Sequence, residues 1–107
     1  MNKKQVLDEL TTMLALSLRH KIGSIVNKNE IYAERYAKDS EILFNQAEKI
    51  KEQGNWNYRD KLEIKQELTK KLRKELEKKD FLPDEKYNYI DSEIEKALKI
   101  LGLCVES

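Results

Sequence analysis

The sequence is poor in the residues that make turns, bind metals and form disulfides. Its 107 residues include only three glycines, one proline, one cysteine and one histidine. A β-sandwich or barrel needs many turns, and a dinucleotide-binding fold needs a glycine-rich phosphate loop, so both classes are disfavoured. The single cysteine, Cys104, excludes an internal disulfide and fits a free thiol in the cytoplasm. The remaining composition, rich in Lys, Glu, Leu and Ile, is typical of a small helical protein.

A charge excess and long apolar runs are also absent. Twenty-one Lys and Arg face 20 Asp and Glu, so the net charge is +1. This balance argues against a histone-like basic protein and against an acidic tail. Asp8 and Glu9 interrupt the first apolar stretch, so we expect no signal peptide, and no run approaches the ~18 apolar residues that cross a bilayer. The sequence therefore predicts a soluble, cytoplasmic chain without a membrane partner.

Motifs for catalysis are missing as well. A structural zinc site takes four Cys or His ligands, whereas His20 and Cys104 are single and far apart in the sequence. No glycine pair has the spacing of a phosphate-binding loop. Asp84-Glu85-Lys86 matches part of a metal-dependent nuclease site, but that chemistry needs a strand, and this triplet opens a helix directly after Pro83. We therefore expect no catalytic residue, no metal and no cofactor, and no enzymatic activity of the chain on its own.

The first half of the chain has helical spacing of apolar residues. Lys3–Lys21 has leucines every three or four residues and is expected to end at Gly23 in a left-handed cap. Asn29 is placed to cap the next helical segment, Glu30–Gln53. That segment fits one helix or two helices broken near Asp39–Ser40, because Asp and Ser both favour the start of a helix.

The second half predicts two more helices. Asn57 and Asp60 resemble a capping box at the start of a long polar helix that ends at the loop Asp80–Asp84. A closing helix then runs to Gly102, and the short connection favours an antiparallel hairpin of the two helices. The expected fold is all-α: a bundle of four to five helices in one domain, residues 1–107, that ends in this hairpin. Its two apolar stripes are Leu68, Leu72, Leu76, Tyr87, Ile90, Ile94, Ala97 and Leu101.

Charge is distributed unevenly over this second half. Residues 57–79 carry nine Lys or Arg against five acids, an excess of +4, and residues 81–107 carry three against six, an excess of −3. The pattern fits a solvated helix face with many ion pairs. It equally fits a basic helix beside an acidic protein surface or a phosphate backbone.

The order of elements after Ile50 resembles a known family. The segment 55–59, Asn-Trp-Asn-Tyr-Arg, leads into the basic helix 65–79, which is followed by an aromatic and proline loop, 78–84, and a closing helix. This order is similar to the C-terminal helical domain of the restriction (motor) subunit of type I restriction-modification enzymes, over about half of the chain. The loop departs from the family pattern, which has Gly and a double proline in this place.

The resemblance implies a docking role without catalysis. In that family the nuclease and motor domains precede a helical tail, which holds the motor on the methyltransferase core. The chain would then be an excised domain or a remnant of a longer protein, with the methyltransferase and specificity core as its protein partner and only indirect or weak contact with DNA. The leucine stripe of the basic helix would serve packing, and Pro83 would shape the loop. The partner-binding residues that the resemblance implies are Trp56, Arg59, Lys70, Lys71, Arg73, Lys74 and Phe81.

Two other functions stay open. The chain fits a free-standing helical adaptor or regulator, for example one encoded by a phage. It also fits a helical nucleic-acid-binding domain that uses Lys65–Lys79, although only Trp56 and Tyr58 lie near that helix to stack on bases. Trp56 has a structural alternative too, as a core anchor, because a tryptophan buries a large apolar area.

Overall fold

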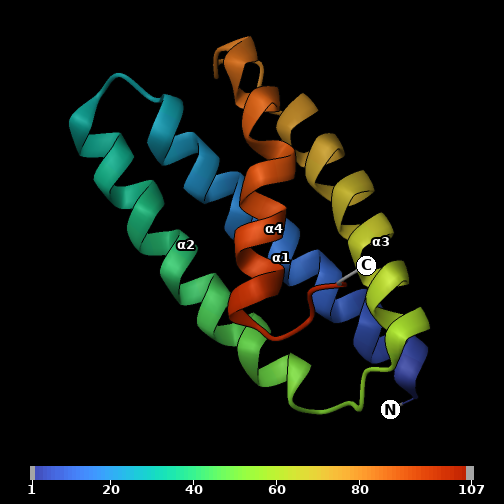
Figure 1. Ribbon diagram of the computed structural model, residues 1–107. Coiled ribbons are helices and arrows are strands. Elements are labelled where there is room, and N and C mark those ends of the chain that lie inside the picture. Colours follow the sequence, from blue (N-terminus) through green and yellow to red (C-terminus); the bar gives the residue numbers. More distant parts are fainter. Residues whose placement is uncertain (1, 106–107) are drawn as a thin grey trace.

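The described part of the protein consists of four α-helices and one short 3-10 helix. Figure 1 shows their arrangement in the computed structural model. The structure describes residues 2–105. Within this part the chain forms no strand, so the predicted all-α fold of four to five helices is confirmed. The elements are α1 (Lys3–Val26), α2 (Glu30–Lys51), α3 (Tyr58–Glu77), η1 (Asp84–Tyr89) and α4 (Ile90–Ile100).

Helix α1 is the element on which the others assemble. Residues 10–18 of this helix carry no charge. Leu10, Leu14 and Leu18 are buried along one side, and Ala15 and Ser17 are buried beside them. Burial at adjacent positions, in addition to every third or fourth one, means that α1 is covered on more than one side. Accordingly, α1 contacts α2, α3, η1 and α4.

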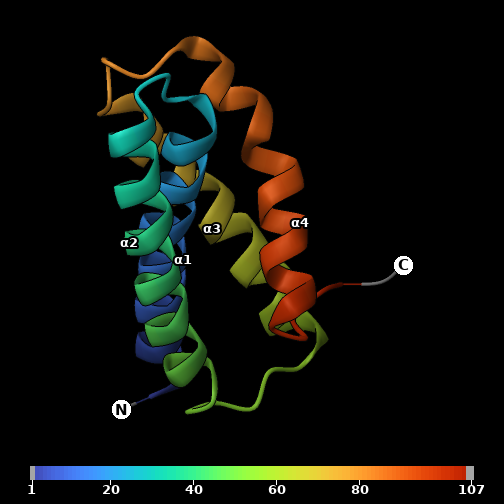
Figure 2. The same cartoon turned by 90° about the vertical axis from the view of Figure 1, so that its left-hand side faces the viewer.

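Helices α1 and α2 lie side by side and approach each other through small residues (Figures 1 and 2). The hydroxyl of Ser17 donates a hydrogen bond to the carbonyl of Ser40 at 2.8 Å. The ring of Tyr36 lies over Gly23, where an added Cβ would come within 3.1 Å of it. Because these contacts use small side chains, α2 buries only Ser40 and Ala47. Among the described elements, its backbone lies close to α1 alone.

The prediction that Gly23 ends the first helix is wrong. Helix α1 continues to Val26, and the carbonyl of Gly23 accepts a hydrogen bond from the Asn27 amide at 3.0 Å. Gly23 is needed for the close contact with Tyr36 and not for a turn. Within residues 2–105, a positive φ occurs only at Gly102, at +70°. Gly102 ends α4 in a left-handed cap, the conformation that glycine adopts with least strain.

Of the two alternatives for the second helix, the single helix is correct. Asn29 caps it as predicted, because its side-chain oxygen accepts a hydrogen bond from the Ile31 amide at 3.0 Å. Asp39 and Ser40 do not interrupt α2. The Ser40 hydroxyl points toward α1, where it lies 3.3 Å from the hydroxyl of Ser17. Ser40, a residue type that often starts a helix, therefore lies inside α2 and contacts Ser17 of α1.

Helix α3 begins with the predicted capping box. The side chain of Asn57 accepts a hydrogen bond from the Asp60 amide at 2.8 Å, and Asp60 accepts one from the Asn57 amide at 3.0 Å.

Leu62 of α3 is 38% exposed and lies outside the buried stripe of this helix. The apolar stripes of α3 and α4 enter the same core, but α3 packs more extensively on α1 than on α4. The antiparallel hairpin of α3 and α4 is not confirmed and stays a prediction.

The chain enters α4 through the 3-10 helix η1 instead of a regular α-turn. Pro83 precedes η1, as expected of a proline at a helix entrance. Lys86 within η1 is only 2% exposed. Its ammonium donates a hydrogen bond to the carbonyl of Lys79 at 2.7 Å, just beyond the end of α3, and lies 5.2 Å from the centroid of the Tyr87 ring. A cation at a helix C-terminus is favourable, so Lys86 stabilises the connection between α3 and α4.

Replacing Ile94 with Asp tests the core. Ile94 is 1% exposed, so the new carboxylate would be buried without a partner. We expect Ile94→Asp to lower the free energy of unfolding by about 3 kcal/mol or more, measured by urea titration. The matched control is Ile42→Asp on α2, where the side chain is 54% exposed and the expected loss is below about 1 kcal/mol. Equal losses for the two variants would contradict the core described here.

Candidate functional site

The residues that the sequence analysis assigned to partner binding do not form one compact site. Trp56 precedes α3 and Phe81 follows it, and a helix of that length separates them by about 30 Å. Trp56 is partly buried against the core. Phe81 is 65% exposed, with the ammonium of Lys79 6.0 Å from its ring centroid.

Trp56 packs into the turn between α2 and α3. Its indole Nε1–H donates a hydrogen bond to the carbonyl of Lys51 at 2.8 Å. Its ring lies against Gly54 so closely that an added Cβ would come within 2.8 Å of it. These contacts give Trp56 the role of an anchor for this turn.

Six of the seven cations of α3 fall into two groups, and the first group holds α3 on its neighbours. The ammonium of Lys71 lies 2.8 Å from a carboxylate oxygen of Asp8 and 2.7 Å from the hydroxyl of Thr11, both on α1. The ammonium of Lys65 lies 2.7 Å from the carboxylate of Glu95 on α4. That hydrogen bond raises the pKa of Lys65 and lowers the pKa of Glu95. Lys71, which the resemblance assigned to partner binding, is thus engaged within the fold.

The second group of cations lies on the outer face of α3. We define this α3 outer face by Arg59, Lys70, Arg73 and Lys74, all of which are exposed. Three helical turns separate Arg59 from Lys70, so the two share one side of the helix. Within residues 2–105, Arg59, Arg73 and Lys74 form no ion pair, and Lys70 has only a long contact of 3.8 Å to Glu67.

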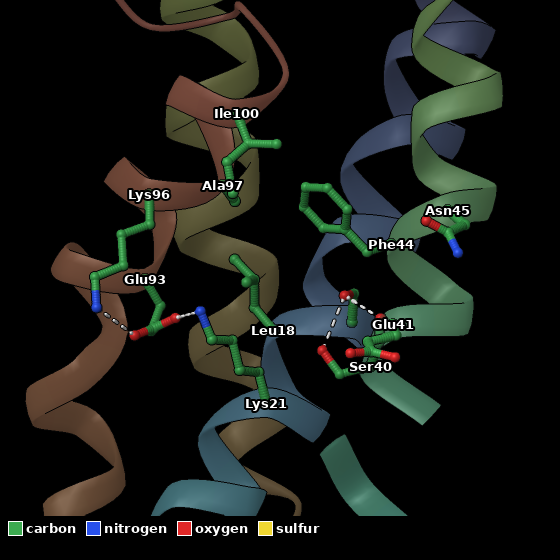
Figure 3. Close-up of a pocket in the computed structure, with 11 residues that line it drawn as sticks. Leu18, Lys21, Ser40, Glu41, Phe44, Asn45, Glu93, Lys96, Ala97 and Ile100 are labelled. Carbon is green, nitrogen blue, oxygen red and sulfur yellow. Dashed lines mark hydrogen bonds and ion pairs between the residues drawn. The ribbon is translucent and has the colours of Figure 1, made fainter. Parts of the chain in front are cut away.

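A groove that the sequence analysis did not predict lies between α2 and α4, with α1 as its floor (Figure 3). Its volume is about 450 Å³. Leu18 of α1, Phe44 of α2, and Ala97 and Ile100 of α4 supply apolar surface. The hydroxyls of Ser17 and Ser40 are already bonded to each other's helix, and Glu41 and Asn45 of α2 also line the groove.

A buried carboxylate with two lysines occupies one end of this α2–α4 groove (Figure 3). Glu93 of α4 is 2% exposed. Lys21 of α1 lies 2.5 Å from its Oε1 as an ion pair without hydrogen-bond alignment, and Lys96 lies 3.3 Å from its Oε2. The side chains of the two lysines are 43% and 63% exposed, so both ammonium groups reach solvent.

One signal in the sequence could have indicated this group. Glu93 lies three residues after Ile90 and four before Ala97, which places an acid in the apolar stripe of α4. An acid at such a position needs a partner, because an unpaired buried charge is costly. The identity of the partner, Lys21, depends on the packing of α4 on α1 and could not be read from spacing.

Two further properties of the described part bear on function. Among residues 2–105, no three His, Cys, Asp or Glu side chains lie together in a way that could hold a metal ion. None of the helices in this part combines the length and the apolar character needed to cross a membrane.

Comparison of the chain with models of known protein families, with curated proteins and with solved structures found no match.

Replacing a lysine with methionine should change the free energy of unfolding differently in the two groups of α3 cations. Lys71→Met removes the contacts with Asp8 and Thr11, so we expect a loss of about 1 kcal/mol in the free energy of unfolding. Lys70→Met on the α3 outer face should change it by less than about 0.5 kcal/mol. Chemical denaturation measures both values. A loss at Lys70 that equals or exceeds the loss at Lys71 would contradict the division of the cations.

Proposed function

We propose that the chain is a non-catalytic helical docking module that binds another protein. The observation that carries the proposal is the α3 outer face, whose four cations are exposed while other lysines of the same helix bind α1 and α4. Packing of α3 does not require the outer cations, so they are available for contact with an acidic surface. Charges of this kind orient a partner and raise the rate of association.

The methyltransferase and specificity core of a type I restriction enzyme is the first partner to test. This choice rests on the resemblance of residues 50–101 to the helical tail of the motor subunit of these enzymes. The role proposed is to hold a motor and nuclease on that core, with DNA contacted weakly or indirectly. A free-standing helical adaptor would use the same α3 outer face for a different protein.

A nucleic-acid-binding domain is the second candidate, because exposed cations also suit phosphates. The surroundings of the α3 outer face favour a protein instead. Glu63 and Glu77 are exposed one turn from Arg59 and Arg73, so acids interrupt the basic surface. Of the two aromatic residues at the start of α3, Trp56 packs into the preceding turn, and only Tyr58, which is 62% exposed, is free to stack on a base.

Charge reversal of the α3 outer face tests the proposal. We expect the triple variant Lys70→Glu, Arg73→Glu and Lys74→Glu to bind the methyltransferase and specificity core at least tenfold more weakly. Its free energy of unfolding should change by less than about 1 kcal/mol, because exposed charges contribute little to stability. Binding is measured by calorimetry with a purified core from the same genome, and duplex DNA is titrated in parallel at two salt concentrations.

The control is a reversal of three exposed lysines elsewhere, Lys28, Lys38 and Lys49, which changes the net charge equally. This control should leave binding of the core unchanged. Equal losses for both triple variants would show a nonspecific charge effect and contradict the proposed face. Tight DNA binding that falls steeply with salt, with no binding of the core, would replace the docking function by the nucleic-acid function.

A further inference from the structure

A second groove lies between α1 and α3, next to the α3 outer face. Its volume is about 230 Å³. A cavity of about 150 Å³ accommodates a benzene molecule, so this α1–α3 groove has room for one leucine or phenylalanine side chain. Ala15, which is buried, and Leu16, which is partly buried, supply apolar surface. Lys74 of the α3 outer face also lines the groove, so the two surfaces are continuous.

The lining of the α1–α3 groove is positively charged. Lys71, Lys74 and Lys78 contribute three positive charges and Glu75 contributes one negative charge, so the net charge is +2. The lining residues of α1 carry no charge. Three larger hollows of the described surface, including the α2–α4 groove, are neutral or negative when their lining charges are counted in the same way.

Ion pairs between this lining and α1 do not cancel the charge. Lys71 lies 2.8 Å from a carboxylate oxygen of Asp8. The carboxylate of Glu75 lies 3.1 Å from the ammonium of Lys78 and 3.6 Å from the guanidinium of Arg19. Asp8 adds one negative charge to the group and Arg19 adds one positive charge, so the total remains +2.

The next acids along the two helices do not cancel it either. Glu67 lies 3.8 Å from Lys70, so these two charges balance each other. Glu9 and Glu77 do not line the groove. Lys74 makes no ion pair within residues 2–105. The α1–α3 groove therefore presents uncompensated positive charge beside a small apolar floor.

We propose that the α1–α3 groove receives an acidic segment of the partner protein in which one large apolar residue lies between two acids. The apolar side chain packs on Ala15 and Leu16, and the flanking carboxylates meet Lys74 and Lys78. Ion pairs at such a partly desolvated site are stronger than in bulk water. The inference rests on the proposed function, because it extends the α3 outer face, and it adds the chemical character of the segment that binds there.

The floor of the groove favours a peptide over a nucleic acid. Phosphates would suit the lysines, but they would also lie beside the carboxylate of Glu75 and would leave the apolar surface of Leu16 without a partner. No aromatic side chain lines the groove, so a base has nothing to stack on. A peptide that alternates acidic and apolar residues satisfies both the charge and the floor.

Defined peptides test the proposal without the natural partner. The first probe is the end-blocked peptide Glu-Asp-Leu-Asp-Glu, the second carries Ser in place of Leu, and the third carries Gln and Asn in place of the acids. Each is titrated into the isotope-labelled 107-residue chain. We expect the first peptide to shift the amide resonances of residues 12–16 and 71–78. The Ser peptide should bind at least threefold more weakly, and the peptide without acids should cause no shift at the same concentration.

Two leucines give a matched pair of variants. Leu16→Gln removes apolar surface from the floor, whereas Leu62→Gln makes the same change at a position of α3 that does not line the groove. We expect Leu16→Gln to weaken binding of the first peptide at least threefold and Leu62→Gln to leave it unchanged. Lys78→Gln, at a side chain that is 70% exposed, should weaken binding to a similar extent without loss of fold. Lys49→Gln on α2 is its control, and circular dichroism establishes that the variants fold.

Several outcomes would overturn the inference. These are equal binding of the Leu and Ser peptides, equal binding by Leu16→Gln and Leu62→Gln, and binding that ignores Lys78. An octamer of deoxythymidine that binds more tightly than the first peptide, with a steep dependence on salt, would assign the lysines to phosphates. Failure of the peptides on a chain that still binds the methyltransferase and specificity core would contradict this inference alone. Peptide binding without binding of the core would contradict only the choice of that core.

Discussion

The burial of α1 is the constraint on which the rest of the structure depends. This helix is uncharged over residues 10–18 and supplies apolar or small side chains to every other element. Each fully buried leucine stabilises the fold by about 1.5–3 kcal/mol relative to an exposed one. The remaining helices are amphipathic and bury single stripes, so each is stable mainly through its contact with this shared core. α2 depends on α1 most directly, because its backbone lies close to no other described helix.

The lysines of α3 show how one residue type serves both fold and surface. Lys65 and Lys71 lie at the edges of the buried stripe, where their ammonium groups reach carboxylates on α4 and α1. Lys70 and Lys74 lie on the outer face and make no contact that the fold requires. A local excess of +4 therefore overstates the positive charge that a partner would meet. The same arithmetic applies to the α2–α4 groove, where Glu41 and Glu93 balance the two lysines Lys21 and Lys96.

Local signals predicted much of the fold. Asn29, Asn57 and Asp60 act as expected, because a helix cap is a contact between residues two or three positions apart. The role of Gly23 was predicted wrongly, because a side chain at this position would be crowded by Tyr36, which lies on another helix. The 3-10 entry into α4 escaped prediction for a related reason: it places Lys86 on the end of α3.

The candidate sites were less predictable than the fold. Sequence spacing located the outer cations of α3 but could not tell that Lys71 turns toward α1. The groove was missed because it arises from the separation of α2 and α4, which no local pattern encodes. Glu93 left a trace in the sequence as an acid within an apolar stripe, whereas Ile100, which lies outside the predicted stripe, left none. Surfaces of this kind follow from packing and become visible only when the helices are in place.

Native-state hydrogen exchange of the isolated chain tests most directly the claim that α1 holds the bundle and that α2 is attached on one side. The account predicts that amides of α1 from Leu10 to Ile22 exchange only through global unfolding. Amides in the middle of α2 should exchange at least tenfold faster through a local opening, because only Ser40 and Ala47 are buried there. Equal protection of α1 and α2 would contradict the account, since it would show that α2 is held as firmly as the helix on which it packs.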